Sequence, residues 1–140
     1  MKAKVVVLFV LAMTISMLFG ACRRPAPEYD TGFLKGEWIR LSSTDSRSDS
    51  MVVEVDMQES IIKYVPATSN FQVGNTKWRN IYTTSRDQLT KRGDFKLSDL
   101  SGSKQVSEST IFVLDANNIE VRSIDYPNAP GGYQLWTRKL

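Results

Sequence analysis

Beyond about residue 33 the chain alternates between short apolar or aromatic runs and clusters of polar turn residues. The runs are rich in Val, Ile, Tyr, Trp and Thr, which favour strands, and Gly, Asn, Asp and Ser separate them. No segment carries an apolar stripe of helical period over three turns. The pattern therefore predicts eight strands, at about 35–42, 50–57, 60–65, 76–84, 93–98, 108–115, 118–124 and 132–139.

Short polar connections predict that neighbouring strands pair in antiparallel fashion. Residues 115–118 and 58–60 each join two runs, and 70–75 form a further turn region. Eight strands without helical cover protect their edges best by closing, so we expect an all-β, up-and-down antiparallel barrel. A two-sheet sandwich is the alternative, since it uses the same alternating strands. A barrel of eight strands is either filled by side chains or holds one small ligand.

Three segments do not have the character of strands. Residues 42–50 form a polar, serine-rich loop, and 126–132 form a second loop with two prolines and two glycines. The stretch 84–92 is too polar to bury a helix face, so we expect a loop or a single helical turn there.

The N-terminus has the layout of a secretory signal peptide. Two lysines precede an apolar run over 5–19, and the small residues Gly20 and Ala21 separate that run from Cys22, the only cysteine. The run is shorter than the roughly 20 apolar residues that span a bilayer. An uncleaved anchor and a plain secreted protein are the alternatives.

Residues 18–22, Leu-Phe-Gly-Ala-Cys, resemble the lipobox of bacterial lipoproteins. The lipobox prefers leucine three residues before the cysteine, whereas this chain has Phe19 there and Leu18 one step earlier. The resemblance implies that Cys22 is the first mature residue and carries two or three acyl chains such as palmitate. Two chains hold a protein stably on a membrane.

These observations define the expected domains and location. Residues 1–21 are the signal peptide, 22–34 the lipidated cysteine with a flexible proline-containing tether, and 35–140 the barrel domain. We expect the protein on a membrane of the bacterial cell envelope, with the outer membrane favoured, facing the periplasm or the exterior.

Composition argues against several function classes. Removing Lys2 and Lys4 with the leader leaves sixteen cations against fifteen acidic residues, a net charge of +1, so nucleic acid is not an expected partner. The chain has no histidine, and therefore lacks the commonest general base and metal ligand. No nucleophile–base pair is visible. We expect no metal, no cofactor and no enzymatic activity.

The first and last strands resemble those of lipocalins. Gly36-Glu37-Trp38 is similar to the Gly-x-Trp signature of the first lipocalin strand, and the last strand ends in Arg138. The resemblance implies that Arg138 lies across Trp38 and closes one end of the barrel. Over 35–140 the chain resembles small lipocalin-like lipoproteins of Bacteroides-type bacteria. The alternative is a core tryptophan and a solvated terminal arginine.

Three aromatic residues are the candidate ligand-binding residues. Trp78 and Tyr82 are an even number of residues apart and are expected on one strand face, about 13 Å apart, where they either line a cavity or fill it. Tyr126, in the loop over 126–132, is the expected rim residue.

Two functions of different kinds fit these sequence features. The first is a barrel that binds a small apolar or amphipathic ligand. The second is a filled barrel whose loops 42–50 and 126–132 dock another envelope protein, and the short chain favours it. The expected partners are the membrane, through the lipid on Cys22, and either that ligand or that protein.

Overall fold

The computed structural model describes residues 30–84 and 95–140. Two short 3₁₀ helices, η1 (Thr31–Leu34) and η2 (Ser46–Ser48), accompany eight strands in this part of the chain. The strands are β1 (Gly36–Ser43), β2 (Val52–Asp56), β3 (Glu59–Tyr64), β4 (Thr76–Thr83), β5 (Phe95–Leu100), β6 (Val106–Val113), β7 (Asn118–Ser123) and β8 (Tyr133–Arg138).

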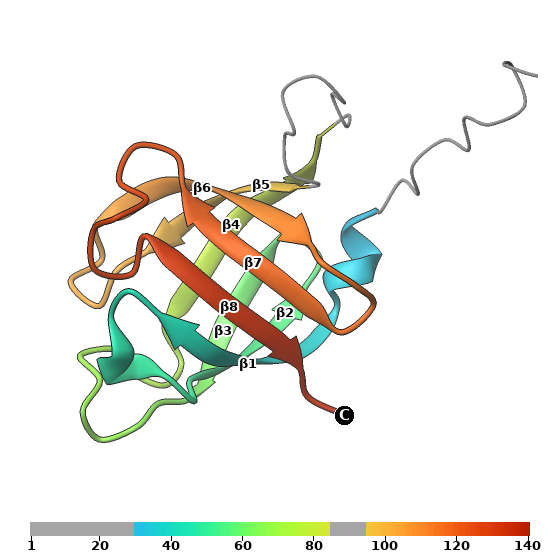
Figure 1. Cartoon of the computed structure of the whole chain (residues 1–140). Coiled ribbons are helices and arrows are strands. Elements are labelled where there is room, and N and C mark those ends of the chain that lie inside the picture. The colour runs from blue at the N-terminus through green and yellow to red at the C-terminus, as the bar shows by residue number, and fades with distance from the viewer. Residues whose placement is uncertain (1–29, 85–94) are drawn as a thin grey trace, which may run out of the picture.

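The eight strands form a closed up-and-down barrel (Figure 1). Each strand pairs antiparallel with the next, and β1 also pairs antiparallel with β8 in a register that places Trp38 opposite Arg138. This last pairing closes the barrel, so the expected small lipocalin-like barrel is confirmed and the alternative sandwich is wrong.

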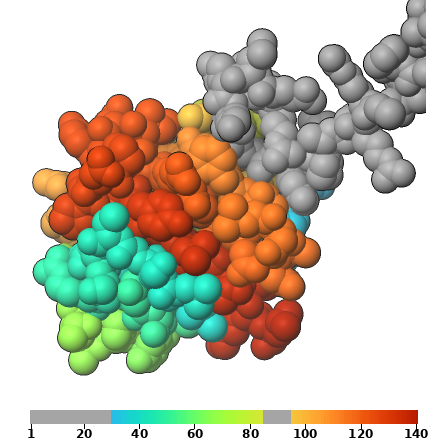
Figure 2. Space-filling model, in the orientation of Figure 1, coloured from blue at the N-terminus to red at the C-terminus, as the bar shows by residue number. Residues whose placement is uncertain are grey.

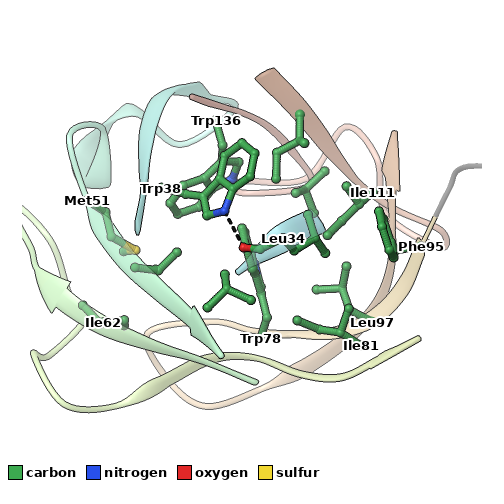
Figure 3. Packing of buried hydrophobic residues seen from close by; sticks show 14 residues of the cluster. Leu34, Trp38, Met51, Ile62, Trp78, Ile81, Phe95, Leu97, Ile111 and Trp136 are labelled. Atoms are coloured by element: carbon green, nitrogen blue, oxygen red, sulfur yellow. Dashed lines mark hydrogen bonds between the residues drawn. The ribbon is translucent and has the colours of Figure 1, made fainter. Parts of the chain in front are cut away.

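Alternation along the strands fills the barrel interior. In β2, for example, Val53 and Val55 are buried while Glu54 and Asp56 are exposed. Figure 3 shows the resulting core, in which side chains from strands all around the barrel meet. Its largest members are three fully buried tryptophans, Trp38, Trp78 and Trp136.

The two ends of the barrel differ. The helix η1 covers one end, which we call the closed end, and the chain leaves β8 toward Leu140 at the same end (Figure 1). The connections 44–51, 65–75, 101–105 and 124–132 lie at the other end, which we call the open end.

The folded unit begins earlier than residue 35. Leu34 of η1 is fully buried in the core and Phe33 packs against it, so the last residues of the expected tether belong to the barrel. The predicted strand at 93–98 is found at Phe95–Leu100. The predicted leader with Cys22, and all but the first residue of the predicted loop 84–92, lie outside the described residues.

Within residues 30–84 and 95–140, no helix has the length and apolar character needed to cross a membrane.

Candidate functional site

At the closed end, Arg138 lies over the ring of Trp38. The guanidinium carbon is 4.4 Å from the ring centroid. Arg138 also donates hydrogen bonds to the carbonyl oxygens of Phe33 (2.6 Å) and Lys35 (2.9 Å), while the Trp38 indole donates to the Leu34 carbonyl at 2.8 Å (Figure 3). The predicted pairing of Trp38 with Arg138 is confirmed, and it fastens η1 across the end of the barrel.

At the open end lies a cavity of about 440 Å³, which we call the mouth cavity. Five buried polar residues line it, and four of them, Arg40, Lys77, Asp99 and Gln134, form what we call its floor; the fifth is Ser123. The floor residues come from β1, β4, β5 and β8, so four strands of the rigid barrel position them. Less buried residues of the open-end connections surround this floor.

A hydrogen-bond chain connects the floor to the core. The Lys77 ammonium donates to one carboxylate oxygen of Asp99 and, at 3.0 Å, to the Leu100 carbonyl. The Gln134 amide donates to the other Asp99 oxygen at 2.6 Å and accepts from the Trp136 indole at 3.0 Å. These hydrogen bonds give partners to buried polar groups that would be costly to bury unpaired, and they hold the Gln134 amide in one orientation.

Burial lowers the pKa of Lys77, and the nearby charge of Arg40 lowers it further, while Asp99 raises it. The Lys77 ammonium also lies 5.0 Å from the centroid of the Phe71 ring. The attraction of the ammonium to the ring face adds to its ion pair with Asp99.

Arg40 is the less well paired of the two buried cations. Its Nη2 donates to the Asp45 carbonyl at 2.8 Å. Its Nε lies 3.4 Å from Asp49 Oδ1, yet neither of these buried atoms has a hydrogen-bond partner among the described residues. Burial lowers the pKa of Arg40, and Asp49, Asp45 and Asp99 oppose that shift.

The loop that carries Asp45 lies over the mouth. Arg47 donates two hydrogen bonds of 2.9 Å to the Asp45 carboxylate, and the hydrogen bond from Arg47 is the main cause of the lowered pKa of Asp45. Thr44 donates to the Ala129 carbonyl at 2.7 Å, so this loop and the Pro-Gly loop lie side by side. Figure 2 shows the two loops, in teal and red, meeting on one face of the molecule.

A second hollow, of about 1050 Å³, lies at the closed end beside η1 and the β2–β3 turn. It is larger, but most of the residues around it, including Lys35, Met57 and Glu59, are exposed. No buried polar side chain lines it among the described residues. The mouth cavity is therefore the candidate ligand site.

Trp78 and Tyr82 do not share a strand face, contrary to the prediction. Trp78 is 0% exposed and packs edge-on against Trp136, with ring centroids 4.9 Å apart, whereas Tyr82 is 53% exposed. The β4–β5 register shifts between Arg79 and Tyr82, and Asn80 has a φ of 56°. The extra residue reverses the alternation, as a β-bulge does. Neither Trp78 nor Tyr82 lines the mouth cavity.

Tyr126 lies where it was expected. It is 67% exposed and lines the mouth cavity from the Pro-Gly loop. Its role as a contact for ligand stays a prediction.

Sequence reasoning missed the four floor residues, although the alternation contained a signal. Arg40 stands two residues after Trp38, and Gln134 stands two residues before Trp136, so each has the inward parity of a core tryptophan. A polar residue with inward parity near a strand end is the pattern that would have located the polar floor.

Comparisons of the chain with protein-family models, with curated proteins and with solved structures find no match.

Proposed function

We propose that this protein is a lipid-anchored barrel of the bacterial cell envelope that binds a small amphipathic ligand in the mouth cavity. The cavity carries the proposal, because its 440 Å³ lie in the range of small-molecule sites. Four buried polar side chains converge on its floor. Convergent polar groups in a cleft supply the orientation and specificity that ligand sites need.

The filled core favours an amphipathic ligand over a purely apolar one. Trp38, Trp78 and Trp136 occupy the space in which an apolar molecule would be enclosed. The remaining space, at the open end, has a polar floor and the partly exposed ring of Phe71 and exposed ring of Tyr126 among its lining residues. A ligand with one polar and one apolar part fits both surfaces.

The leader pattern supports the lipid anchor at Cys22. The described chain begins with Asp30 next to η1, at the closed end. A lipid on Cys22 would therefore connect the membrane to the closed end, and the mouth cavity would open at the end remote from that connection. The ligand would then enter from the aqueous side.

Metabolic labelling with a radioactive fatty acid tests the anchor. The wild-type protein should incorporate label, and Cys22→Ala should not. Label on the variant, or a mature N-terminus at another residue, would show that the lipoprotein assignment is wrong.

Native mass spectrometry of the protein extracted from envelopes tests the binding function. A small molecule bound in stoichiometric amount supports the proposal. A second candidate is docking of another envelope protein, which the adjoining loops 42–50 and 126–132 favour because Thr44 and Ala129 hold them together as one surface. A stoichiometric protein partner without a small molecule would support docking instead.

A further inference from the structure

We propose that the ligand of the mouth cavity carries an anionic group, a carboxylate or a phosphate, and binds with this group inward against Arg40 and its apolar part at the rim. This inference rests on the proposed ligand-binding function. It concerns the chemical class of the ligand and its orientation in the cavity.

Among the side chains that line the cavity, cations outnumber carboxylates by three to two. Three cations line the cavity, and two of them already have carboxylate partners that line it too. Arg47 is paired with Asp45, and Lys77 with Asp99. The third cation is Arg40, whose ion-pair partner, Asp49, does not line the cavity.

Arg40 is buried without the hydrogen bonds that a guanidinium normally makes. The residue is 1% exposed. It donates to the backbone carbonyl of Asp45, and its Nε remains without a hydrogen-bond partner among the described residues. This Nε lies 3.4 Å from Asp49 Oδ1 without a hydrogen bond, so the buried cation is short of hydrogen bonds. An oxyanion in the cavity offers several further acceptors to the planar guanidinium.

Lys77 and Gln134 lie on the same floor as Arg40, where the anionic end of the ligand would bind. Lys77 and Arg40 both line the cavity, and the charge of Arg40 contributes to the lowered pKa of Lys77, so a negative group near both would favour their charged forms. Gln134 is already engaged with Asp99 and Trp136 and is held rigidly beside them. The floor is therefore held in one arrangement before a ligand binds, and Arg40 is the floor cation whose carboxylate partner lies outside the cavity.

Apolar groups lie farther out, where the cavity meets solvent. Val106 and Tyr126 both line the cavity and are 48% and 67% exposed. Phe71 lines it too and is only partly buried. Covering these side chains with the hydrocarbon part of a ligand is favourable. The acid group must then point toward the floor.

The test compares three water-soluble probes of equal chain length: hexanoate, hexyl phosphate and 1-hexanol. Each is titrated into the full-length protein in detergent while the Arg40 Nε–H resonance and the backbone amides of Phe71 and Tyr126 are followed by NMR. We expect both groups of signals to shift with the acids, and at least one acid to bind tenfold or more tightly than hexanol. The stronger acid identifies the head group.

Two variants sharpen the comparison. Arg40→Gln should reduce the preference for the acid to less than threefold. Lys63→Gln, at an exposed cation that is paired with Glu54 and does not line the cavity, should leave that preference within twofold of wild type. If Arg40→Gln does not fold, the affinities of the acids and of hexanol for the wild-type protein, together with the shift of the Arg40 resonance, decide whether the ligand carries an anionic group.

The experiment distinguishes failure of the anionic head group from failure of the ligand-binding function. Equal affinity for hexanol and the acids, or acid binding that leaves the Arg40 resonance unmoved, overturns the anionic head group while the ligand-binding function stands. Absence of binding by all three probes at millimolar concentration overturns the inference together with the proposed function.

Discussion

The Arg138 guanidinium lies 4.4 Å from the centroid of the Trp38 ring, at the point where the last strand pairs with the first. The same side chain donates to two carbonyl oxygens in and next to η1, those of Phe33 and Lys35. One residue near the C-terminus therefore joins both ends of the folded chain and covers the core beneath it.

Arg138→Lys should lower the free energy of unfolding by about 1–3 kcal/mol, because lysine keeps the charge but loses the planar fork that reaches the ring and both carbonyls. Urea unfolding followed by circular dichroism measures the change. Lys139→Gln removes only an exposed ion pair with Glu37 and should change stability by less than about 0.5 kcal/mol. Equal effects of the two variants would contradict a closing role for Arg138.

Trp78→Ala and Tyr82→Ala should differ strongly in their effect on stability, because Trp78 faces the core and Tyr82 faces solvent. The first leaves a large cavity in the core and should cost about 3–5 kcal/mol, whereas the second removes an exposed ring and should cost less than about 0.5 kcal/mol. Thermal and urea unfolding of both variants measures this. A large loss of stability with Tyr82→Ala would mean that the bulge near Asn80 does not turn Tyr82 outward.

Gln134→Leu should break the hydrogen-bond chain beneath the mouth cavity. Leucine leaves the Trp136 indole and one Asp99 oxygen without their present partner, so we expect a loss of about 1–3 kcal/mol and a shifted Trp136 indole N–H resonance. Gln105→Leu, at an exposed position that also lines the cavity, is the matched control and should be close to neutral. An unchanged Trp136 indole resonance in Gln134→Leu would show that the hydrogen bond between Trp136 and Gln134 is not formed.

Asp115 should make the β6–β7 turn sensitive to acid. Hydrogen bonds from the Asn118 side chain and the Asn117 and Asn118 backbone lower its pKa below the ordinary 3.8. The folded state therefore binds fewer protons than the unfolded state at the pH values between the two pKa values. The stabilisation is present above pH 3.8 and is lost as pH falls through the folded pKa.

The measurement is a carbon-detected NMR titration of the carboxyl groups, together with unfolding at several pH values. Asp115→Asn should make unfolding less dependent on pH in the acid range. A carboxyl of Asp115 that titrates at or above 3.8 would contradict the turn geometry.

Local sequence signals were sufficient to predict the barrel. Strand alternation and turn residues are properties of neighbouring positions, and closure follows from the need to protect two edges. The pairing of Trp38 with Arg138 was also predicted, through the resemblance of the two terminal strands to those of lipocalins.

The site was less accessible to sequence reasoning, for two physical reasons. The bulge in β4 depends on how that strand pairs with β5. Asn tolerates the positive φ that Asn80 adopts, but an Asn within a strand does not by itself predict a bulge, so counting residues placed Tyr82 on the wrong face. The floor depends on partners far apart in the chain. Lys77 and Asp99 are 22 residues apart, and each alone resembles an ordinary solvated charge.

The most direct test of the binding site is to fill the mouth cavity and measure ligand retention. Ser107 lines the cavity, whereas Ser103 in the preceding turn is exposed and does not, so Ser107→Phe and Ser103→Phe form a matched pair. Both variants are extracted from envelopes, checked for the barrel by circular dichroism, and studied by native mass spectrometry. We predict that wild type and Ser103→Phe retain a small molecule and that folded Ser107→Phe does not. Retention by folded Ser107→Phe at the wild-type level would contradict the claim that the mouth cavity is the binding site.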